Sequence, residues 1–351
     1  MQKTIVDGVR MWSAWQPQPN VFFNSYFIES DEGNLVTDPL PLYDADAGEI
    51  EERGGIAWVV LTNRDHERSA RELAQRFGAK IAASAADAPL LSGPIDRMLA
   101  DGETIGDASV LTFEGLKTPG EIALHFPKKH AAIVGDALWG DVAGSLRLGP
   151  KLADPAKAAL SLRRLAAVRP EHLLLGDGQS IFGGAQRAIW TCLEASADVY
   201  VNKANADELP WSVDPPTVRQ PYECAWLDID FFIGAEKLGY RVARLAPGKA
   251  FCPLHWHSAE EELFVVLEGE PTLVTSRGNW KLRKGDYVAF PTRASGAHKV
   301  VNESSGPCEI LMVSNVEPNE ACHYPDSQKI LVDPEGLILR DHPVLDYYDG
   351  E

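Results

Sequence analysis

The last third of this 351-residue chain contains a group of side chains that can bind a metal ion. His255 and His257 are two positions apart, three consecutive glutamates (Glu260, Glu261 and Glu262) follow them, and His298 comes later. Residues i and i+2 of a strand point to the same face, so both imidazoles can reach one ion. Three imidazoles and one carboxylate suit a single divalent transition metal: Fe, Mn, Ni, Co, Cu or Zn.

The two segments that carry these residues resemble the conserved motifs of the cupin superfamily. GKAFCPLHWHSAEEELFVVLEG is similar to G…HxH(x3–4)Ex6G, and GDYVAFPTRASGAHKVVN is similar to Gx5P…Hx3N. The resemblance covers roughly 222–330 and implies a jelly-roll β-barrel. In the first motif six residues separate the ligand glutamate from a glycine. If that glycine is Gly269, only Glu262 of the three glutamates has the required spacing. The resemblance therefore implies the ligands His255, His257, Glu262 and His298.

The first 200 residues contain a second ordered series of polar segments. LTNRDHER (61–68), TPGE (118–121), GDAL (135–138) and LLGDG (174–178) follow one another. In this order they resemble the THxHxDH, TPGH, bridging-aspartate and GHG landmarks of the metallo-β-lactamase superfamily. The resemblance implies an αββα sandwich.

The zinc ligands of that family are not kept. The resemblance puts Asn63, Asp65, Arg68, Glu121 and Asp177 where the family has histidines, and Glu67 where it has an aspartate; only the bridging Asp136 remains, and His66 is one place away from any ligand. Zinc chemistry needs imidazoles or thiolates, so we expect no zinc hydrolase activity and a structural role.

Two alternative interpretations of these N-terminal residues stay open. The oxygen donors Asp65, Glu121, Asp136 and Asp177 could bind Mg²⁺ or Ca²⁺, or Arg64 or Arg68 could replace the cation.

The pattern of apolar residues changes along the chain. Up to about residue 200 it predicts alternating strands and helices, including a hairpin over 21–41, a strand at 56–62, a helix closed by Gly78 and a helix begun by Asp154-Pro155. The proline-rich stretch 205–221 is typical of a linker. Short strands separated by turn residues follow. We therefore predict an α/β domain at 1–204, a linker at 205–221 and an all-β domain at 222–351.

Composition and charge limit the partners. The formal net charge of −18 is unfavourable for nucleic acid or an anionic membrane. No apolar stretch approaches the ~20 residues that span a bilayer, and the first residues lack the apolar segment of a signal peptide. The five cysteines are odd in number and form no CxxC, as in reduced cytosolic proteins. We expect a cytoplasmic homodimer.

The metal group predicts an enzyme that acts on a small, oxygen-rich organic molecule by oxygenase, isomerase or lyase chemistry. The alternative is a metal-assisted binding or sensor protein without turnover. Nearness in sequence makes four residues candidates for orienting the substrate: Arg241, Arg244, Trp256 and Arg293. Cys252 is expected to be a packed or rim thiol, and His323 and His342 surface residues.

Overall fold

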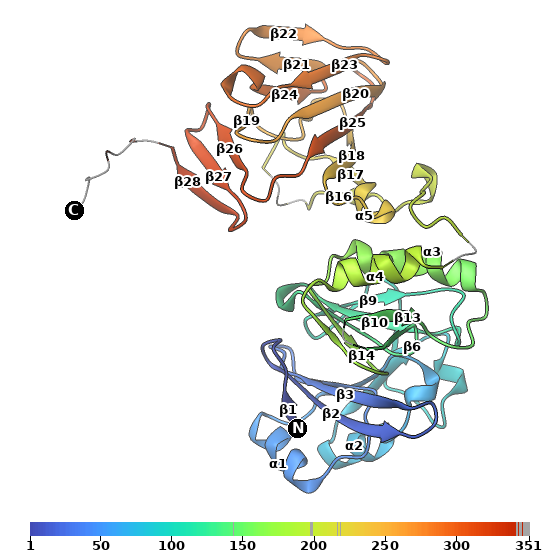
Figure 1. The fold of residues 1–351 in the computed structure, drawn as a ribbon. Helices are drawn as coiled ribbons and strands as arrows, with labels where there is room; N and C mark the ends of the chain where they lie inside the picture. Colours follow the sequence, from blue (N-terminus) through green and yellow to red (C-terminus); the bar gives the residue numbers. More distant parts are fainter. Residues whose placement is uncertain are drawn as a thin grey trace. The chain divides into compact units, whose positions relative to one another are not determined.

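The computed structural model describes residues 1–142, 144–196, 199–215, 217, 219–341, 343 and 346, so that His342 lies outside the described residues. The chain divides into two compact units, Met1–Lys203 and Ala204–Glu351 (Figure 1). Within the described ranges, none of the helices is long and apolar enough to cross a membrane.

The first unit is built on two large sheets (Figure 1). One has the order β1 (Gln2–Lys3), β2 (Val9–Gln16), β3 (Val21–Ile28), β4 (Leu35–Thr37), β5 (Trp58–Leu61), β6 (Lys80–Ser84) and β7 (Arg97–Leu99). The other has the order β15 (Ile181–Phe182), β14 (His172–Leu175), β11 (Ala131–Val134), β10 (Ile122–Phe126), β9 (Ala108–Thr112) and β8 (Thr104–Ile105). A small pair, β12 (Leu138–Gly140) and β13 (Leu146–Leu148), is added.

Three apolar clusters lie between the layers of this unit. One, which includes Tyr26 and Phe126, lies between the two sheets. A second packs α1 (Asp44–Glu52) and α2 (Ala70–Phe77) on the first sheet. A third packs α3 (Pro155–Ala167) and α4 (Ala185–Glu194) on the second sheet. The order helix, sheet, sheet, helix confirms the predicted αββα sandwich.

Local sequence signals set the ends of these helices. The helix α2 ends at Gly78, which has φ of +67°, a conformation that favours glycine. The helix α3 begins after Asp154, whose carboxylate accepts a hydrogen bond from the Lys157 backbone N–H (3.0 Å), with Pro155 in the first turn. Both predicted boundaries are confirmed.

The second unit consists mainly of strands, with the short helix α5 (Asp230–Ile233) and two single 3-10 turns at Ala206–Glu208 and Ala294–Gly296 among its described residues. One sheet has the order β16 (Ser212–Val213), β17 (Ala225–Asp228), β18 (Leu238–Leu245), β25 (Cys308–Asn315), β20 (Glu262–Glu268) and β23 (Tyr287–Phe290). A second has β22 (Gly278–Lys281), β21 (Thr272–Thr275) and β24 (His298–Val301). Phe251, Phe264 and Phe290 belong to its apolar core. Together with the sandwich of the first unit, this unit confirms the predicted α/β plus all-β class.

Two features differ from the sequence pattern. The stretch 205–221 contains β16, which pairs with β17, so part of the proline-rich segment is an edge strand of the second unit. A further sheet joins β19 (Trp256–His257) to the antiparallel strands β26 (Ala321–Tyr324), β27 (Lys329–Val332) and β28 (Leu337–Arg340). We call β26, β27 and β28 the C-terminal meander.

Candidate functional site

Three strands of the second unit carry three of the four predicted metal-binding side chains, and the fourth, His255, lies just before β19. His257 ends β19, Glu262 begins β20 and His298 begins β24. His255 is fixed opposite His298, because the two backbones exchange both N–H···O=C hydrogen bonds (3.1 and 2.9 Å). The strand pairing therefore brings donors that are up to 43 positions apart (255 to 298) into one group.

The Nε2 atoms of the three histidines converge on one carboxylate oxygen. Glu262 Oε2 lies 3.1 Å from Nε2 of His298, 3.4 Å from that of His257 and 4.0 Å from that of His255. Within the described residues, Glu262 Oε2 and His298 Nε2 are buried and have no hydrogen-bond partner. Buried polar atoms without partners are costly unless a ligand satisfies them. The donor set therefore fits a divalent transition metal.

The other ring nitrogen, Nδ1, lies beside a backbone carbonyl oxygen in two of these histidines. His255 Nδ1 lies 3.0 Å from the Pro253 carbonyl oxygen, and His298 Nδ1 lies 2.9 Å from that of Gly296. A carbonyl at Nδ1 favours the tautomer with the proton there, which leaves the lone pair on Nε2. This is the usual orientation of metal-binding histidines.

Burial and neighbouring charges keep the donors in the form that binds metal. Burial, with the nearby His298 and His257, lowers the pKa of His255 to about 4, so its imidazole is neutral at pH 7. Burial would raise the pKa of Glu262, but the contact with His298 and the other imidazoles lowers it below the ordinary value. A neutral imidazole and an ionised carboxylate are both metal ligands.

The neighbouring glutamates do not join the converging Nε2 atoms, although Glu260 Oε2 lies 3.9 Å from Nδ1 of His257. The turn after His257 continues to Glu261, so Glu262 is the first residue of the next strand. Glu260 Oε1 accepts a hydrogen bond from the Glu317 backbone N–H (3.0 Å). Glu261 is exposed.

The candidate substrate-orienting residues are not gathered around the donors. Arg241 pairs with Asp228 (2.5 Å) and Arg244 with Glu309 (2.6 Å) on β17, β18 and β25. Trp256 points away from the metal-binding group, because alternate residues of a strand face opposite ways. It stacks on His323 at 3.8 Å between ring centroids, so His323 is not the free surface residue that we expected. Arg293 is exposed.

Two thiols lie beside the donors. Cys252 Sγ is 3.3 Å from His255 Nδ1. Cys322, which the sequence reasoning did not single out, lies opposite His257 in the β19–β26 pair and within 4.8 Å of donor atoms of His255 and His257. Burial raises the pKa of the Cys322 thiol to about 11. Burial also raises the pKa of the Cys252 thiol well above its ordinary value, so both thiols are neutral neighbours of the imidazoles.

A cavity of about 440 Å³ borders this group without including its donors. Phe290 and Ala297 belong to its lining, and the Phe290 ring stacks on the His298 ring with centroids 3.7 Å apart. Its polar wall is formed by Thr275, Ser276, Arg277 and Ser295. The cavity offers space and hydrogen-bonding groups for a small polar molecule.

The first unit gathers its polar residues where strands end. Asp38 follows β4, Thr62 follows β5, Asp136 follows β11 and Asp177 follows β14. These strands run parallel in two pairs, β4 with β5 and β11 with β14. The carboxyl ends of parallel strands meet at one edge, where functional groups of α/β folds commonly lie.

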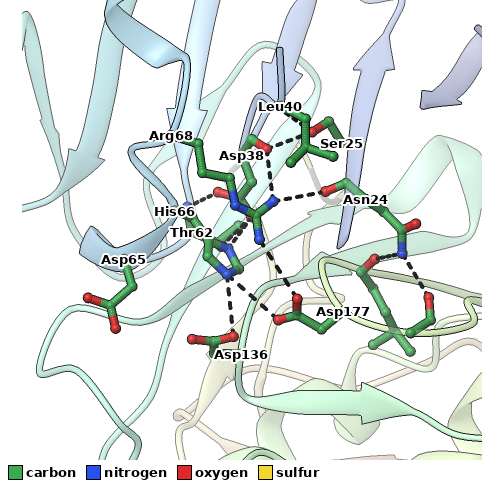
Figure 2. Close-up of polar contacts among 12 residues, drawn as sticks. Asn24, Ser25, Asp38, Leu40, Thr62, Asp65, His66, Arg68, Asp136 and Asp177 are labelled. Atoms are coloured by element: carbon green, nitrogen blue, oxygen red, sulfur yellow. Dashed lines mark hydrogen bonds and ion pairs between the residues drawn. The ribbon is translucent and has the colours of Figure 1, made fainter. Parts of the chain in front are cut away.

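His66 lies at the centre of this cluster, among three carboxylates (Figure 2). Its Nδ1 is 3.0 Å from Asp38 Oδ2, and its Nε2 is 3.3 Å from Asp136 Oδ1 and 3.7 Å from Asp177 Oδ2. Two glycines make room for the ring: a Cβ at Gly135 or at Gly176 would lie 3.1 Å from His66 Cε1. The sequence VGD (134–136) and LGDG (175–178) thus contains both the aspartates and the space for the imidazole.

Two further cations complete the cluster. Arg68 Nη2 lies 3.7 Å from Asp177 Oδ1, and its guanidinium covers the Phe23 ring at 4.6 Å. Lys117 Nζ lies 2.7 Å from Asp136 Oδ2 and 2.6 Å from Asp65 Oδ2. Lys117, Asp38 and His66 were not predicted as members of this site. Three cations therefore stand where the resemblance implies metal ions.

The remaining predicted positions are distributed around the cluster. Asn63 accepts a hydrogen bond from the Asp65 backbone N–H (2.9 Å). Glu67 faces away, toward Arg71 and Ser92. Glu121 is buried, and its Oε1 accepts from the Thr118 backbone N–H (3.1 Å). Arg64 lies beside Asp65 (3.8 Å), outside the buried group.

The charges of the cluster depend on one another. Burial alone would lower the pKa of His66, but Asp38 and Asp136 raise it to about 10, so the imidazole is a cation at pH 7. Burial and Asp136 raise the pKa of Asp177 to about 8, and burial raises that of Glu121 to about 7. Burial opposes the ionisation of Asp136, but hydrogen bonds with His66 and Asp177 hold its pKa well below the ordinary value.

The cluster does not fit a dinuclear zinc centre. It supplies one imidazole, and that imidazole is held as a cation by Asp38 and Asp136. Arg68 and Lys117 bring fixed positive charge to the carboxylates that would hold the ions. A zinc site needs several neutral imidazoles or thiolates.

The two units match two family models. Residues 3–195, more than half of the chain, match the model of the metallo-beta-lactamase superfamily. Residues 241–314 match the model of the cupin domain. These domains imply metal binding, for which the group of His255, His257, Glu262 and His298 is the candidate.

Curated relatives match the first unit. The chain is 39% identical over 132 residues to a hydroxyacylglutathione hydrolase of Acidiphilium cryptum, which is 36% of this chain and 52% of that protein. It is 34% identical over 161 residues to a hydroxyacylglutathione hydrolase of Cereibacter sphaeroides, which is 43% of this chain and 60% of that protein. The chain thus spans little more than half the length of these relatives.

Solved structures of two kinds are similar to parts of the chain. A cupin-superfamily sugar phosphate isomerase of Silicibacter pomeroyi is 25% identical, with a TM-score of 0.36, over 41% of this chain and 97% of that one. A metallo-beta-lactamase of Pontibacter korlensis is 16% identical, with a TM-score of 0.46, over 55% of this chain and 98% of that one. With its first 195 residues matched almost throughout, the chain belongs to the metallo-beta-lactamase superfamily, and a cupin domain follows that fold.

Proposed function

We propose that the cupin domain binds one divalent transition metal through Nε2 of His255, His257 and His298 and the carboxylate of Glu262. The observation that carries this proposal is the convergence of the three Nε2 atoms on Glu262 Oε2, within 3.1 to 4.0 Å. Fe, Mn, Ni, Co, Cu and Zn all accept such a donor set.

The substrate is a small, oxygen-rich organic molecule such as a keto acid or a diol, and the reaction is of the oxygenase, isomerase or lyase type. When bound, the metal supplies Lewis-acid polarisation of a substrate oxygen. Glu262 and the histidines serve as ligands and not as acid–base groups. The polar wall of the neighbouring cavity, with Arg277 and Ser276, could orient such a molecule.

Elemental analysis combined with a turnover screen tests this function. The purified protein should contain close to one transition metal per chain, and His298→Ala should lose it. A panel of keto acids, diols and sugar phosphates should yield turnover that depends on the metal. Protein that refuses all six metals in titration would contradict the metal site. Binding of a panel member without turnover would favour the sensor or binding protein instead.

We further propose that the first unit is not a hydrolase, because Arg68, Lys117 and protonated His66 fill the place of the metal ions. The curated relatives are named hydroxyacylglutathione hydrolases, so the direct test is a hydroxyacylglutathione thioester offered to the full chain. No turnover is expected, with or without added zinc. Zinc-dependent hydrolysis that is lost in Asp136→Asn would overturn this proposal.

A further inference from the structure

A buried carboxylate from outside the cupin family match holds the turn between two candidate ligands. Glu320 lies just before β26, six positions beyond the matched residues 241–314, and is 3% exposed. Its Oε1 accepts a hydrogen bond from the Ser258 backbone N–H (2.7 Å). Its Oε2 accepts from the N–H groups of Ala259 (2.8 Å) and Glu260 (2.9 Å).

This arrangement fixes the conformation of the turn. Successive backbone N–H groups that point to one place form a concave site for an anion. Ser258 to Glu260 make up most of the connection from His257 to Glu262. Because one carboxylate holds three consecutive amides, it sets how far and at what angle these two donors face each other.

The Glu320 carboxylate also faces His257, on the side of the ring that carries Nδ1. Glu320 Oε1 lies 3.5 Å from Nδ1 of His257, while Nε2 of that ring lies 3.4 Å from Glu262 Oε2. A carboxylate beside Nδ1 favours the tautomer whose proton is on Nδ1, and the lone pair on Nε2 is then free for a metal. His255 and His298 obtain the same orientation from backbone carbonyls. The Nδ1 atom of His257 has no hydrogen-bond partner among the described residues. Glu320 is the nearer of the two carboxylates beside it, because Glu260 Oε2 lies 3.9 Å away.

The C-terminal meander reinforces this contact. The strands β26 and β19 pair, with His257 opposite Cys322 and Trp256 opposite His323. The rings of Trp256 and His323 stack with an interplanar angle of 1°. Ser258 also donates its backbone N–H to the Ala321 carbonyl (3.1 Å). The strand that carries His257 is therefore held by residues 320 to 323.

We propose that Glu320 is a positioning residue of the cupin metal site, which fixes the 258–260 turn and orients His257. This inference rests on the proposed metal function. Glu320 does not reach the metal itself, because its oxygens are engaged by the turn. Its loss should weaken metal binding by about 10- to 100-fold, the range found when groups behind a ligand are removed.

The test is metal titration of the full chain in the Glu320→Gln variant, with Co²⁺ as the probe. Gln keeps the shape of the side chain but loses the charge and one acceptor oxygen. Affinity should fall about 10- to 100-fold, and the absorption spectrum of the Co²⁺-saturated variant should shift because His257 is no longer held in one orientation. Glu335→Gln, at an exposed position in the turn between β27 and β28, should change neither quantity.

The saturated spectrum separates positioning from mere stabilisation. A residue that only stabilises the fold would lower the melting temperature and leave the spectrum of bound Co²⁺ unchanged. If Glu320→Gln does not fold, Glu320→Asp keeps the charge and should show a smaller loss of affinity. Wild-type affinity and spectrum in a folded Glu320 variant would overturn the inference alone. Wild-type protein that binds no Co²⁺ would overturn the proposed function and this inference with it.

Discussion

His66 and His255 are both buried imidazoles, and their surroundings move their pKa values in opposite directions. Two carboxylates of the first unit raise the pKa of His66 to about 10. Burial beside other imidazoles lowers the pKa of His255 to about 4. A protonated ring cannot bind a metal, whereas a neutral ring can. The two clusters therefore use the same residue type for different purposes, one as an internal cation and the other as a donor.

Removal of His66 should destabilise the first unit. In His66→Ala the carboxylates of Asp38 and Asp136 lose their shared cation, and breaking a buried ion pair costs about 3–5 kcal/mol of unfolding free energy. The folded pKa lies above the ordinary value, so this contribution is fully present below pH 6.5 and is lost as the pH rises toward 10. Urea unfolding of the wild type and of His66→Ala at pH 6 and pH 10 measures this difference in the free energy of unfolding.

The matched control is His125→Ala, because His125 is only partly buried and its Nδ1 lies beside the Ser109 hydroxyl (3.5 Å) instead of a carboxylate. Its effect should be small at both pH values. An equal loss of stability for His66→Ala at pH 6 and pH 10 would contradict the assigned charge of the imidazole.

The three adjacent glutamates provide a direct comparison of ligand assignment. Glu262→Gln should deplete the metal by at least about 10- to 100-fold in affinity, since it removes a charged donor. Glu260→Gln and Glu261→Gln should stay near wild type, because these side chains lie outside the converging Nε2 group. Metal content by elemental analysis decides the matter. Depletion in either neighbour with full occupancy in Glu262→Gln would refute the assignment.

At the scale of elements, patterns within one segment were sufficient to predict many strands and helices. The apolar spacing of Ala70, Leu73 and Phe77 predicts α2, and alternate histidines on one strand predict a shared face. Long-range pairing was not predictable in this way. The C-terminal meander has no distinctive motif, so the contacts of Glu320 and Cys322 with β19 depend on strand pairing across some 60 positions. The central role of His66 depends on the space left by Gly135 and Gly176.

A single turn delivers His298, and its glycine should be sensitive to substitution. A Cβ at Gly296 would lie 1.8 Å from the Pro291 carbonyl oxygen. Gly296→Ala must therefore move the turn that precedes β24, and we expect a loss of about 1–3 kcal/mol in stability together with weaker metal binding. Gly306→Ala is the control, because its added Cβ would meet nothing within 4 Å. Thermal melting and metal titration of both variants test this. Normal metal affinity in Gly296→Ala would be the contrary result.

At the scale of the whole molecule, one sheet edge stands out as a place for self-association. The strand β28 lies at the edge of its sheet, and its side chains Leu337, Ile338 and Leu339 are 52%, 62% and 50% exposed. An exposed apolar edge strand tends to pair with another chain, and most soluble homo-oligomers are two-fold symmetric. The net charge of −18 acts against unspecific association.

We therefore expect a homodimer that uses this edge. Ile338→Lys should shift the mass measured by light scattering at micromolar concentration from dimer toward monomer. Leu90→Lys, at another exposed apolar position (52%), which belongs to the first unit, should leave the dimer intact. A wild-type monomer, or a dimer that persists in Ile338→Lys, would count against this edge.

The position of Glu320 has a practical consequence for how the cupin domain is defined. The family match stops at residue 314, and all four candidate ligands lie inside it. A shortened protein cut at that border would keep every donor and still lack the anion that orders the turn between two of them. Its weak metal binding would then be mistaken for an absent site. Expressed fragments should therefore extend at least through β28. When ligands are assigned to such a domain by alignment, the residues of the strand that supports the ligand turn should be included.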